Sequence, residues 1–147
     1  MTELYKIVLT SCLTIFGGVF VFTIGQLISK FLIEPIHEQS KCIGEIADAL
    51  IFYANLYASP GTDMPEKRHE ASKSLRQYGS LIISKTHMIK FYSLLEKLGL
   101  VRKQKDILEA SQELIRLSNS IYSGKYVFNI TSRQKIMKAL NIRLEIK

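Results

Sequence analysis

The spacing of hydrophobic positions changes once along the chain, close to residue 30. From Ile7 to Ile28 most side chains are apolar and none is charged, whereas later apolar residues recur every three or four positions among charged ones. A helix of about 20 apolar residues spans the roughly 30 Å hydrocarbon core of a bilayer. The first stretch therefore predicts a transmembrane helix over residues 7–33, after a short extracytoplasmic N-terminus over residues 1–6.

Three other interpretations of the apolar stretch are a cleaved signal peptide, a lipoprotein signal and a buried core helix. A signal peptide ends at small residues, and no alanine precedes Ala47. Residues Leu9–Cys12 are similar to a lipobox, but only two apolar residues of the run precede them. A core helix of this length usually carries charges on one face. The composition thus favours a membrane span.

The distribution of basic residues predicts the orientation of the span. Residues 1–34 hold two acidic and two basic side chains, so the whole formal charge of +7 belongs to the rest of the chain. Lysine and arginine accumulate on the cytoplasmic side of membrane proteins. We therefore expect the N-terminus outside and residues 34–147 in the cytoplasm.

Four small residues form a heptad stripe along the predicted span: Ser11, Thr14, Gly18 and Gly25. Small residues let membrane helices approach closely, and hydroxyl groups can hydrogen-bond between helices. Glycine is also common in membrane helices that lack this role. We interpret the stripe as an oligomerisation face.

Helical periodicity continues after Pro35, which removes one helix hydrogen bond and can kink the chain. The apolar positions that keep this spacing are Ile36, Ile43, Ile46, Leu50, Tyr53 and Tyr57. If the kink is mild, one helix runs from Leu4 to Tyr57 and is on the order of 80 Å long. Residues 59–62 then predict a break, and Asp63 predicts the N-cap of a second helix.

The remaining pattern predicts further helices and no strands. We expect residues 88–98 to continue as helix, either directly or after a bend. Its apolar residues are Phe91, Leu94, Leu95 and Leu98, and we expect Gly99 to end it. A clear apolar face follows on Ile107, Ala110, Leu114, Leu117 and Ile121, and Gly124 closes that helix.

The C-terminal region predicts a last short helix that starts at Thr131 or Ser132, with Val127 and Phe128 packed back on the bundle. The predicted fold class is all-α, with a single N-terminal transmembrane helix that continues into a four- or five-helix cytoplasmic bundle.

Two groups of basic residues are candidate binding surfaces for a lipid or another partner. They are Lys67, Arg68, Lys73 and Arg76, and Arg102, Lys103 and Lys105. Basic side chains attract both anionic lipids and nucleic-acid phosphates. No aromatic residues are interleaved with them as stacking platforms for bases. We therefore favour a membrane surface over nucleic acid, and a soluble protein partner remains an alternative.

The residue types that carry chemistry are few and scattered. His37 and His69 each precede a glutamate, but adjacent residues of a helix point in different directions and do not chelate a metal. Glu109 and Glu113 lie one turn apart beside basic residues, which predicts a solvated charged face. We predict no catalytic residue, no metal site and no cofactor, and we do not expect an enzyme.

Several stretches resemble a group of small bacterial inner-membrane proteins of uncharacterised activity. They are Phe31–Ile36, Ile43–Leu50, Phe91–Leu95 with Leu98–Val101, and Leu114–Ser120. The resemblance implies one N-terminal membrane helix and a helical cytoplasmic domain. The architecture is also loosely similar to the pore-forming membrane accessory of RNA-targeting CRISPR systems, which has a HEPN-like bundle.

The comparison with HEPN proteins does not extend to their catalytic pair. HEPN ribonucleases use an arginine four to six residues before a histidine, and no arginine stands at that distance before His37, His69 or His87. We therefore expect a non-enzymatic, membrane-anchored protein that self-associates as a homo-oligomer, as a pore-like or effector assembly. The alternative is a monomeric membrane tether whose basic helical domain binds a soluble protein or RNA.

Overall fold

The computed structural model describes residues 2–58, 65–122 and 126–143, and contains helices and no strand in these ranges. The chain divides into two compact units, Met1–Glu34 and Pro35–Lys147. The all-α prediction is thus confirmed for the described residues. The predicted break at residues 59–62, the Asp63 cap and the Gly124 helix end lie outside them.

The first unit is helical throughout its described length. It consists of α1 (Thr2–Ile28) and the π-helical turn η1 (Ser29–Ile33), in which the N–H of Glu34 donates to the Ser29 carbonyl. A proline ring crowds the carbonyl four residues before it in a regular α-helix. The wider turn immediately precedes Pro35, and helical structure continues past the proline into α2 (Glu34–Phe52).

The helix does not extend to Tyr57 as one element. A tighter turn at Tyr53 separates α2 from α3 (Ala54–Ala58), because the N–H of Leu56 donates to the Tyr53 carbonyl three residues earlier, at 3.0 Å. Tyr53 and Tyr57 nevertheless both face the core. The predicted apolar face is therefore correct, whereas the predicted single helix is wrong at this turn.

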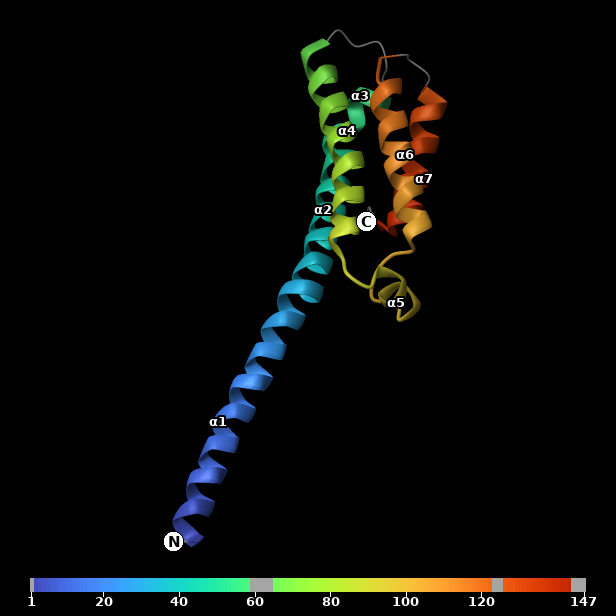
Figure 1. The fold of residues 1–147 in the computed structure, drawn as a ribbon. Coiled ribbons are helices and arrows are strands. Elements are labelled where there is room, and N and C mark those ends of the chain that lie inside the picture. The colour runs from blue at the N-terminus through green and yellow to red at the C-terminus, as the bar shows by residue number, and fades with distance from the viewer. Residues whose placement is uncertain (1, 59–64, 123–125, 144–147) are drawn as a thin grey trace. The chain divides into compact units, whose positions relative to one another are not determined.

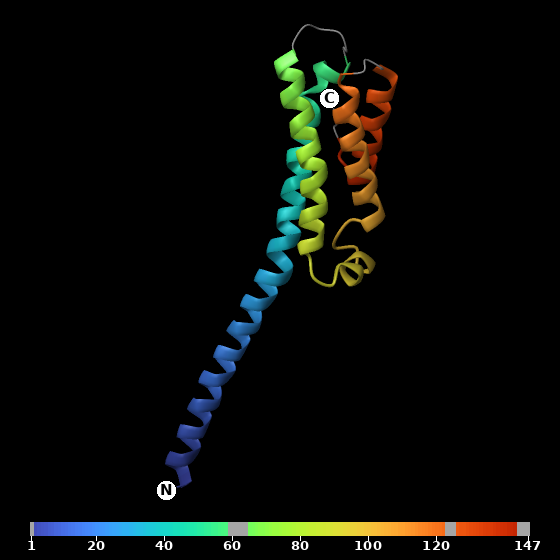
Figure 2. The ribbon, with the colours of Figure 1, turned by 45° about the horizontal axis from the view of Figure 1, so that its top comes forward.

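The second unit is built on four long helices that run side by side and alternate in direction (Figures 1 and 2). They are α2, α4 (Pro65–Met88), α6 (Gln104–Ser120) and α7 (Tyr126–Leu140). The short helix α5 (Tyr92–Lys97) lies at the end where α2 enters and α4 ends. The other short helix, α3, lies near the opposite end.

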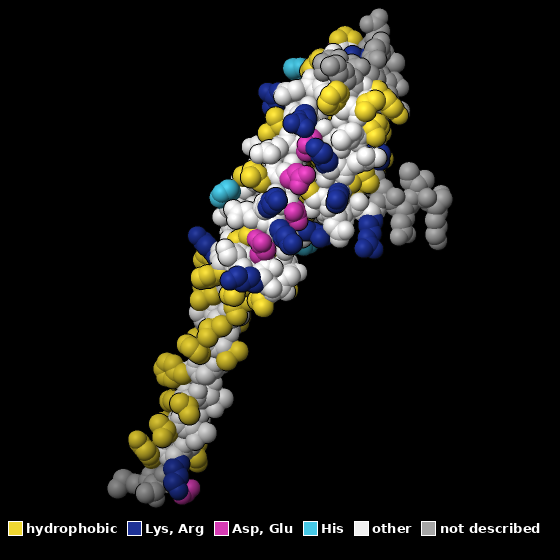
Figure 3. Space-filling view, turned by 90° about the vertical axis from the view of Figure 1, so that its right-hand side faces the viewer, with side chains coloured by type: hydrophobic (Ala, Val, Ile, Leu, Met, Phe, Trp, Pro, Cys, Tyr) yellow, Lys and Arg dark blue, Asp and Glu magenta, His cyan; other side chains and the backbone are white. Residues whose placement is uncertain are grey.

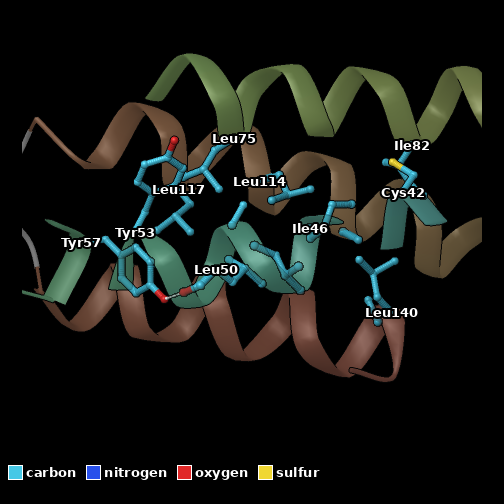
Figure 4. Packing of buried hydrophobic residues seen from close by; sticks show 14 of the residues in the cluster. Cys42, Ile46, Leu50, Tyr53, Tyr57, Leu75, Ile82, Leu114, Leu117 and Leu140 are labelled. Carbon is cyan, nitrogen blue, oxygen red and sulfur yellow. Dashed lines mark hydrogen bonds between the residues drawn. The ribbon is translucent and has the colours of Figure 1, made fainter. Parts of the chain in front are cut away.

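Every long helix of the bundle contributes to one hydrophobic core (Figure 4). The five apolar residues predicted for α6 are all buried, because their spacing of three or four places them on one side of the helix. Other fully buried side chains include Ile46, Leu50, Leu75, Ile82, Ile136 and Leu140. The hydroxyl of Tyr57 donates to the Leu50 carbonyl inside this core.

The last helix differs from the prediction. It begins at Tyr126 within the described residues, well before Thr131, and Val127 and Phe128 are 72% and 58% exposed rather than packed on the bundle. The inward face of α7 starts instead with the fully buried Asn129. The first core-facing position of α7 is thus polar, and hydrophobicity indicated the wrong residues in this turn. Later in the same helix, the apolar residues Ile136, Ala139 and Leu140 are buried.

The end of α5 is confirmed in detail. Gly99 has a φ of 72°, the left-handed conformation that glycine adopts without steric cost. The N–H of Leu100 donates to the Leu95 carbonyl, and the N–H of Gly99 donates to the Glu96 carbonyl, both at 3.0 Å. These two bonds form a Schellman motif, which stops the helix and turns the chain toward α6.

Candidate functional site

The first helix is apolar on all sides and is not part of a core. Among the described residues, only the helical segment that begins with α1 is long and apolar enough to cross a membrane, and no residue of its apolar window is buried. A core helix of this composition would be covered by other elements. The buried-helix interpretation therefore does not fit the structure.

The proposed oligomerisation residues share one face of α1. At about 100° per residue, Ser11, Thr14, Gly18 and Gly25 fall within an arc of about 60°. A Cβ atom added to Gly18 or Gly25 would meet nothing within 4 Å. The Thr14 hydroxyl donates to the Thr10 carbonyl of its own helix at 2.9 Å. This face therefore has open space at Gly18 and Gly25, and the Thr14 hydroxyl already has a hydrogen-bond partner within its own helix.

The basic residues of α4 do not form a single face. Lys67, Lys73 and Arg76 are exposed and Arg68 is half-buried, and at about 100° per residue the four spread over more than half of the helix circumference. Only Lys73 and Arg76 lie close together, one turn apart. The guanidinium of Arg76 donates to the Asn119 side chain on α6, so it also joins two helices.

The second basic group lies at the other end of the bundle. Arg102, Lys103 and Lys105 are exposed where the chain passes from α5 into α6, whereas Lys67 and Arg68 stand near the start of α4 (Figure 1). Between the two ends, Lys and Arg side chains are interspersed with acidic ones on one face of the bundle (Figure 3). The structure therefore keeps the two predicted basic groups separate.

A polar contact at the start of α2 was missed by the sequence analysis. Gln39 is buried, and its Nε2 donates to Thr86 Oγ1 at 2.8 Å and to the Tyr92 hydroxyl at 3.3 Å. This amide therefore connects α2 with α4 and α5. The burial of Gln39 could have been predicted from the sequence, because it lies three residues before Cys42 and seven before Ile46. This spacing places it on the same helix face as these two buried residues.

An ion pair supports the same contact. Lys85 Nζ lies 2.8 Å from Glu38 Oε2, and this hydrogen bond lowers the pKa of Glu38 and raises the pKa of Lys85. Beside them, burial raises the pKa of the Cys42 thiol to about 11. A reactive cysteine needs a thiolate. Cys42 is therefore protonated at neutral pH and acts as a core residue.

Glu113 is not on a solvated face, which corrects the prediction for this residue. It is 6% exposed, and its Oε1 lies 3.2 Å from both Arg116 Nη1 and Lys135 Nζ. Burial pushes the pKa of Glu113 up, but hydrogen bonds from Ser132 and Lys135, with the two positive charges, bring it below its usual value. The periodicity of α6 could not show that α7 supplies Lys135.

Two of the three histidines make ordinary hydrogen-bond contacts. His87 Nδ1 lies 2.9 Å from the Ile83 carbonyl of its own helix, and His69 Nδ1 lies 3.4 Å from the Tyr122 hydroxyl. In the part of the chain that the structure describes, no three His, Cys, Asp or Glu residues gather as a metal site.

No protein-family model, curated protein or solved structure matches this chain. Its function is therefore inferred from its own residues.

Proposed function

We propose that this chain is a single-pass, non-enzymatic protein of the bacterial inner membrane that self-associates through α1. Its N-terminus is outside and its helical bundle is in the cytoplasm. The observation that carries the proposal is that no residue in the apolar window of the first helical segment is buried. Such a helix is stable in water only if another surface covers it, whereas lipid covers it on every side.

The polar groups of α1 support a lipid environment. A buried hydroxyl group without a partner is costly in hydrocarbon. Thr10, Thr14 and Thr23 each donate to the carbonyl four residues earlier, at 2.8, 2.9 and 2.8 Å. All three threonine hydroxyls therefore have partners within the helix, and they add no unsatisfied donor to the membrane interior.

Self-association follows from the small-residue face. Leu, Ile and Phe side chains gain little by leaving lipid for another helix, so membrane helices associate where small residues allow close backbone contact. Gly18 and Gly25 have open space where a side chain would stand. A second copy of α1 can approach there, and assembly would bring the attached bundles together as a pore-like or effector complex.

The test is the mass of the full-length protein in mild detergent, measured by light scattering and corrected for bound detergent. We expect a discrete oligomer for the natural sequence and a loss of most of it in Gly18→Leu and Gly25→Leu. Thr23→Leu is the matched control, because Thr23 lies about 150° around the helix from the small-residue face. Membrane fractionation of each variant checks that insertion is unchanged.

Two outcomes would contradict self-association through the small-residue face of α1. Normal oligomers from both glycine variants would show that the face is irrelevant. A monomer in several detergents and in lipid nanodiscs would favour the alternative, a tether whose basic bundle captures a soluble protein or RNA.

A further inference from the structure

The segment around α5 exposes a cluster of large apolar side chains. Between residues 88 and 100, five of them are more than half exposed: Met88 53%, Phe91 74%, Leu94 57%, Leu98 64% and Leu100 60%. Contiguous exposed apolar surface on a small domain usually marks a place of interaction. This segment is therefore a candidate contact surface.

Other side chains of this segment, and not the exposed ones, fill the space next to the core. Ile89 and Leu95 of the same segment are buried at 4% and 3% exposure, so the inward side of α5 is already occupied. Phe91 adopts a left-handed conformation with a φ of 55°, which starts α5 in a new direction after α4. Leu94 of α5 and Leu98, the C-cap residue one turn later, consequently lie on a side that the bundle does not cover.

Basic side chains alternate along the chain with these exposed apolar residues. Residues 88–105 contain five basic side chains and one acidic one, a net charge of +4 out of +7 for the chain. Lys90, Lys97, Arg102, Lys103 and Lys105 are all exposed. The acid, Glu96, is half-buried and accepts a hydrogen bond from the Gln104 backbone N–H at 3.2 Å. The surface thus combines apolar groups with net positive charge.

The bundle holds this segment against the start of α2. A cleft of about 360 Å³ is lined on one side by Gly99–Arg102 and on the other by residues of α2 that include Ile36 and Gln39. Ile36 follows the last residue of η1, Ile33, by three positions, so even an extended chain keeps the two within about 11 Å. Covalent connection alone therefore keeps Ile36, which lines this cleft, near the last residue of η1.

We propose that residues 88–105, here called the α5 loop, bind the anionic surface of the same bilayer that α1 enters. The exposed apolar side chains insert at the boundary between headgroups and acyl chains, and the basic side chains contact anionic headgroups. The proposal rests on the membrane attachment of α1 proposed above and is independent of self-association. It gives the bundle a second attachment point, which restricts its orientation at the membrane.

The chain contains no tryptophan, so one introduced tryptophan is a unique fluorophore. We would place it in the full-length protein as Leu98→Trp, reconstituted in vesicles of phosphatidylcholine and phosphatidylglycerol. Quenching by brominated lipid should be several-fold stronger than for Phe128→Trp, the matched control at the exposed start of α7. Phe22→Trp, in α1, reports on the membrane span itself. Circular dichroism verifies that each variant keeps its helical content.

The quenching results distinguish failure of the α5-loop proposal from failure of the proposed membrane span of α1. One outcome is strong quenching of the tryptophan at position 22, with quenching at position 98 equal to that at position 128. It overturns the α5-loop proposal and still supports the membrane span of α1. Absence of quenching at both 22 and 98 overturns both. If neither aqueous iodide nor brominated lipid quenches the tryptophan at position 98, protein covers the α5 loop. This result likewise overturns the proposal.

A second measurement tests the basic side chains. In the Leu98→Trp protein, Arg102→Glu together with Lys103→Glu should reduce the quenching by brominated lipid to less than half. Vesicles without phosphatidylglycerol should reduce the quenching of the Leu98→Trp protein itself by the same amount. Quenching that is unchanged in both experiments contradicts the role of anionic lipid.

Discussion

The Nδ2 atom of Asn129 donates a hydrogen bond of 2.9 Å to the backbone carbonyl of Tyr57, 72 residues earlier in the chain. Asn129 is fully buried, and its Oδ1 accepts a hydrogen bond from the Ser120 hydroxyl. The amide therefore connects α3, α6 and α7 at one point. A polar side chain fixes the start of α7, which explains why Val127 and Phe128 face outward.

Replacement of this amide should be costly. Asn129→Ala removes the buried donor to the Tyr57 carbonyl and one hydrogen bond of the Ser120 hydroxyl, which also donates to the Leu117 carbonyl. We expect a loss of about 2 kcal/mol in the free energy of unfolding, because the Tyr57 carbonyl loses this hydrogen bond inside the bundle. Urea unfolding of the full-length protein in mild detergent, followed by circular dichroism, measures it. Gln134→Ala, at an exposed position of the same helix, is the control. Equal effects of the two changes would contradict the role of Asn129.

Two glycines should respond to alanine with opposite signs. A Cβ on Gly79 would stand 3.1 Å from the Ser111 carbonyl oxygen and 3.2 Å from Ile115 Cγ1, whereas a Cβ on Gly44 meets nothing within 4 Å. Gly79→Ala should therefore destabilise the protein by about 1.5 kcal/mol, because α4 and α6 must move apart.

Gly44→Ala should instead stabilise the protein by about 0.5–1 kcal/mol, because alanine is the better residue inside a helix. Midpoints of thermal unfolding, compared in one detergent, provide the test for both variants. A stabilising Gly79→Ala would mean that the close contact between α4 and α6 is absent.

Glu113 should make stability depend on pH. Its pKa in the folded protein lies below the ordinary value of 4.5, so its contribution is present above that value and disappears as the pH falls through the lower folded pKa. Glu113→Gln should lower the free energy of unfolding by about 1.5 kcal/mol at pH 7, where the charged hydrogen bonds are lost.

The difference between Glu113→Gln and the natural sequence should narrow as the pH falls below the ordinary value of 4.5, because the unfolded chain then takes up a proton that the folded carboxylate resists. Unfolding curves at a series of pH values show this directly, and the Glu38–Lys85 pair affects both proteins equally. A difference in the free energy of unfolding that does not change at any pH below 4.5 would mean that the carboxylate charge is not involved.

The sequence was sufficient where one physical effect decides the structure. The composition of residues 7–28 predicts a long apolar helix, and the spacing of Ile107, Leu114 and Leu117 predicts the buried face of α6. Gly99 predicts the residue at which α5 ends. The shared face of Ser11, Thr14, Gly18 and Gly25 likewise follows from helical geometry alone.

The prediction failed where a polar group from elsewhere in the chain decides which side is buried. Gln39 and Glu113 are buried because Thr86 and Lys135 reach them from other helices. The apolar residues Phe91, Leu94 and Leu98 were expected to line a helix face like Leu95, but the left-handed residue at position 91 redirects α5, and only Leu95 is buried. No local pattern contains that information.

The buried thiol of Cys42 gives the bundle a native reporter of its own motions. Because the thiol is enclosed and protonated at neutral pH, it can react with an alkylating reagent only when α2 separates from the helices around it. The rate of alkylation at Cys42, followed separately from that at the exposed Cys12, therefore measures how often this part of the bundle opens. An event at the membrane that loosens the bundle would be recorded in the protein as a covalent mark at one cysteine.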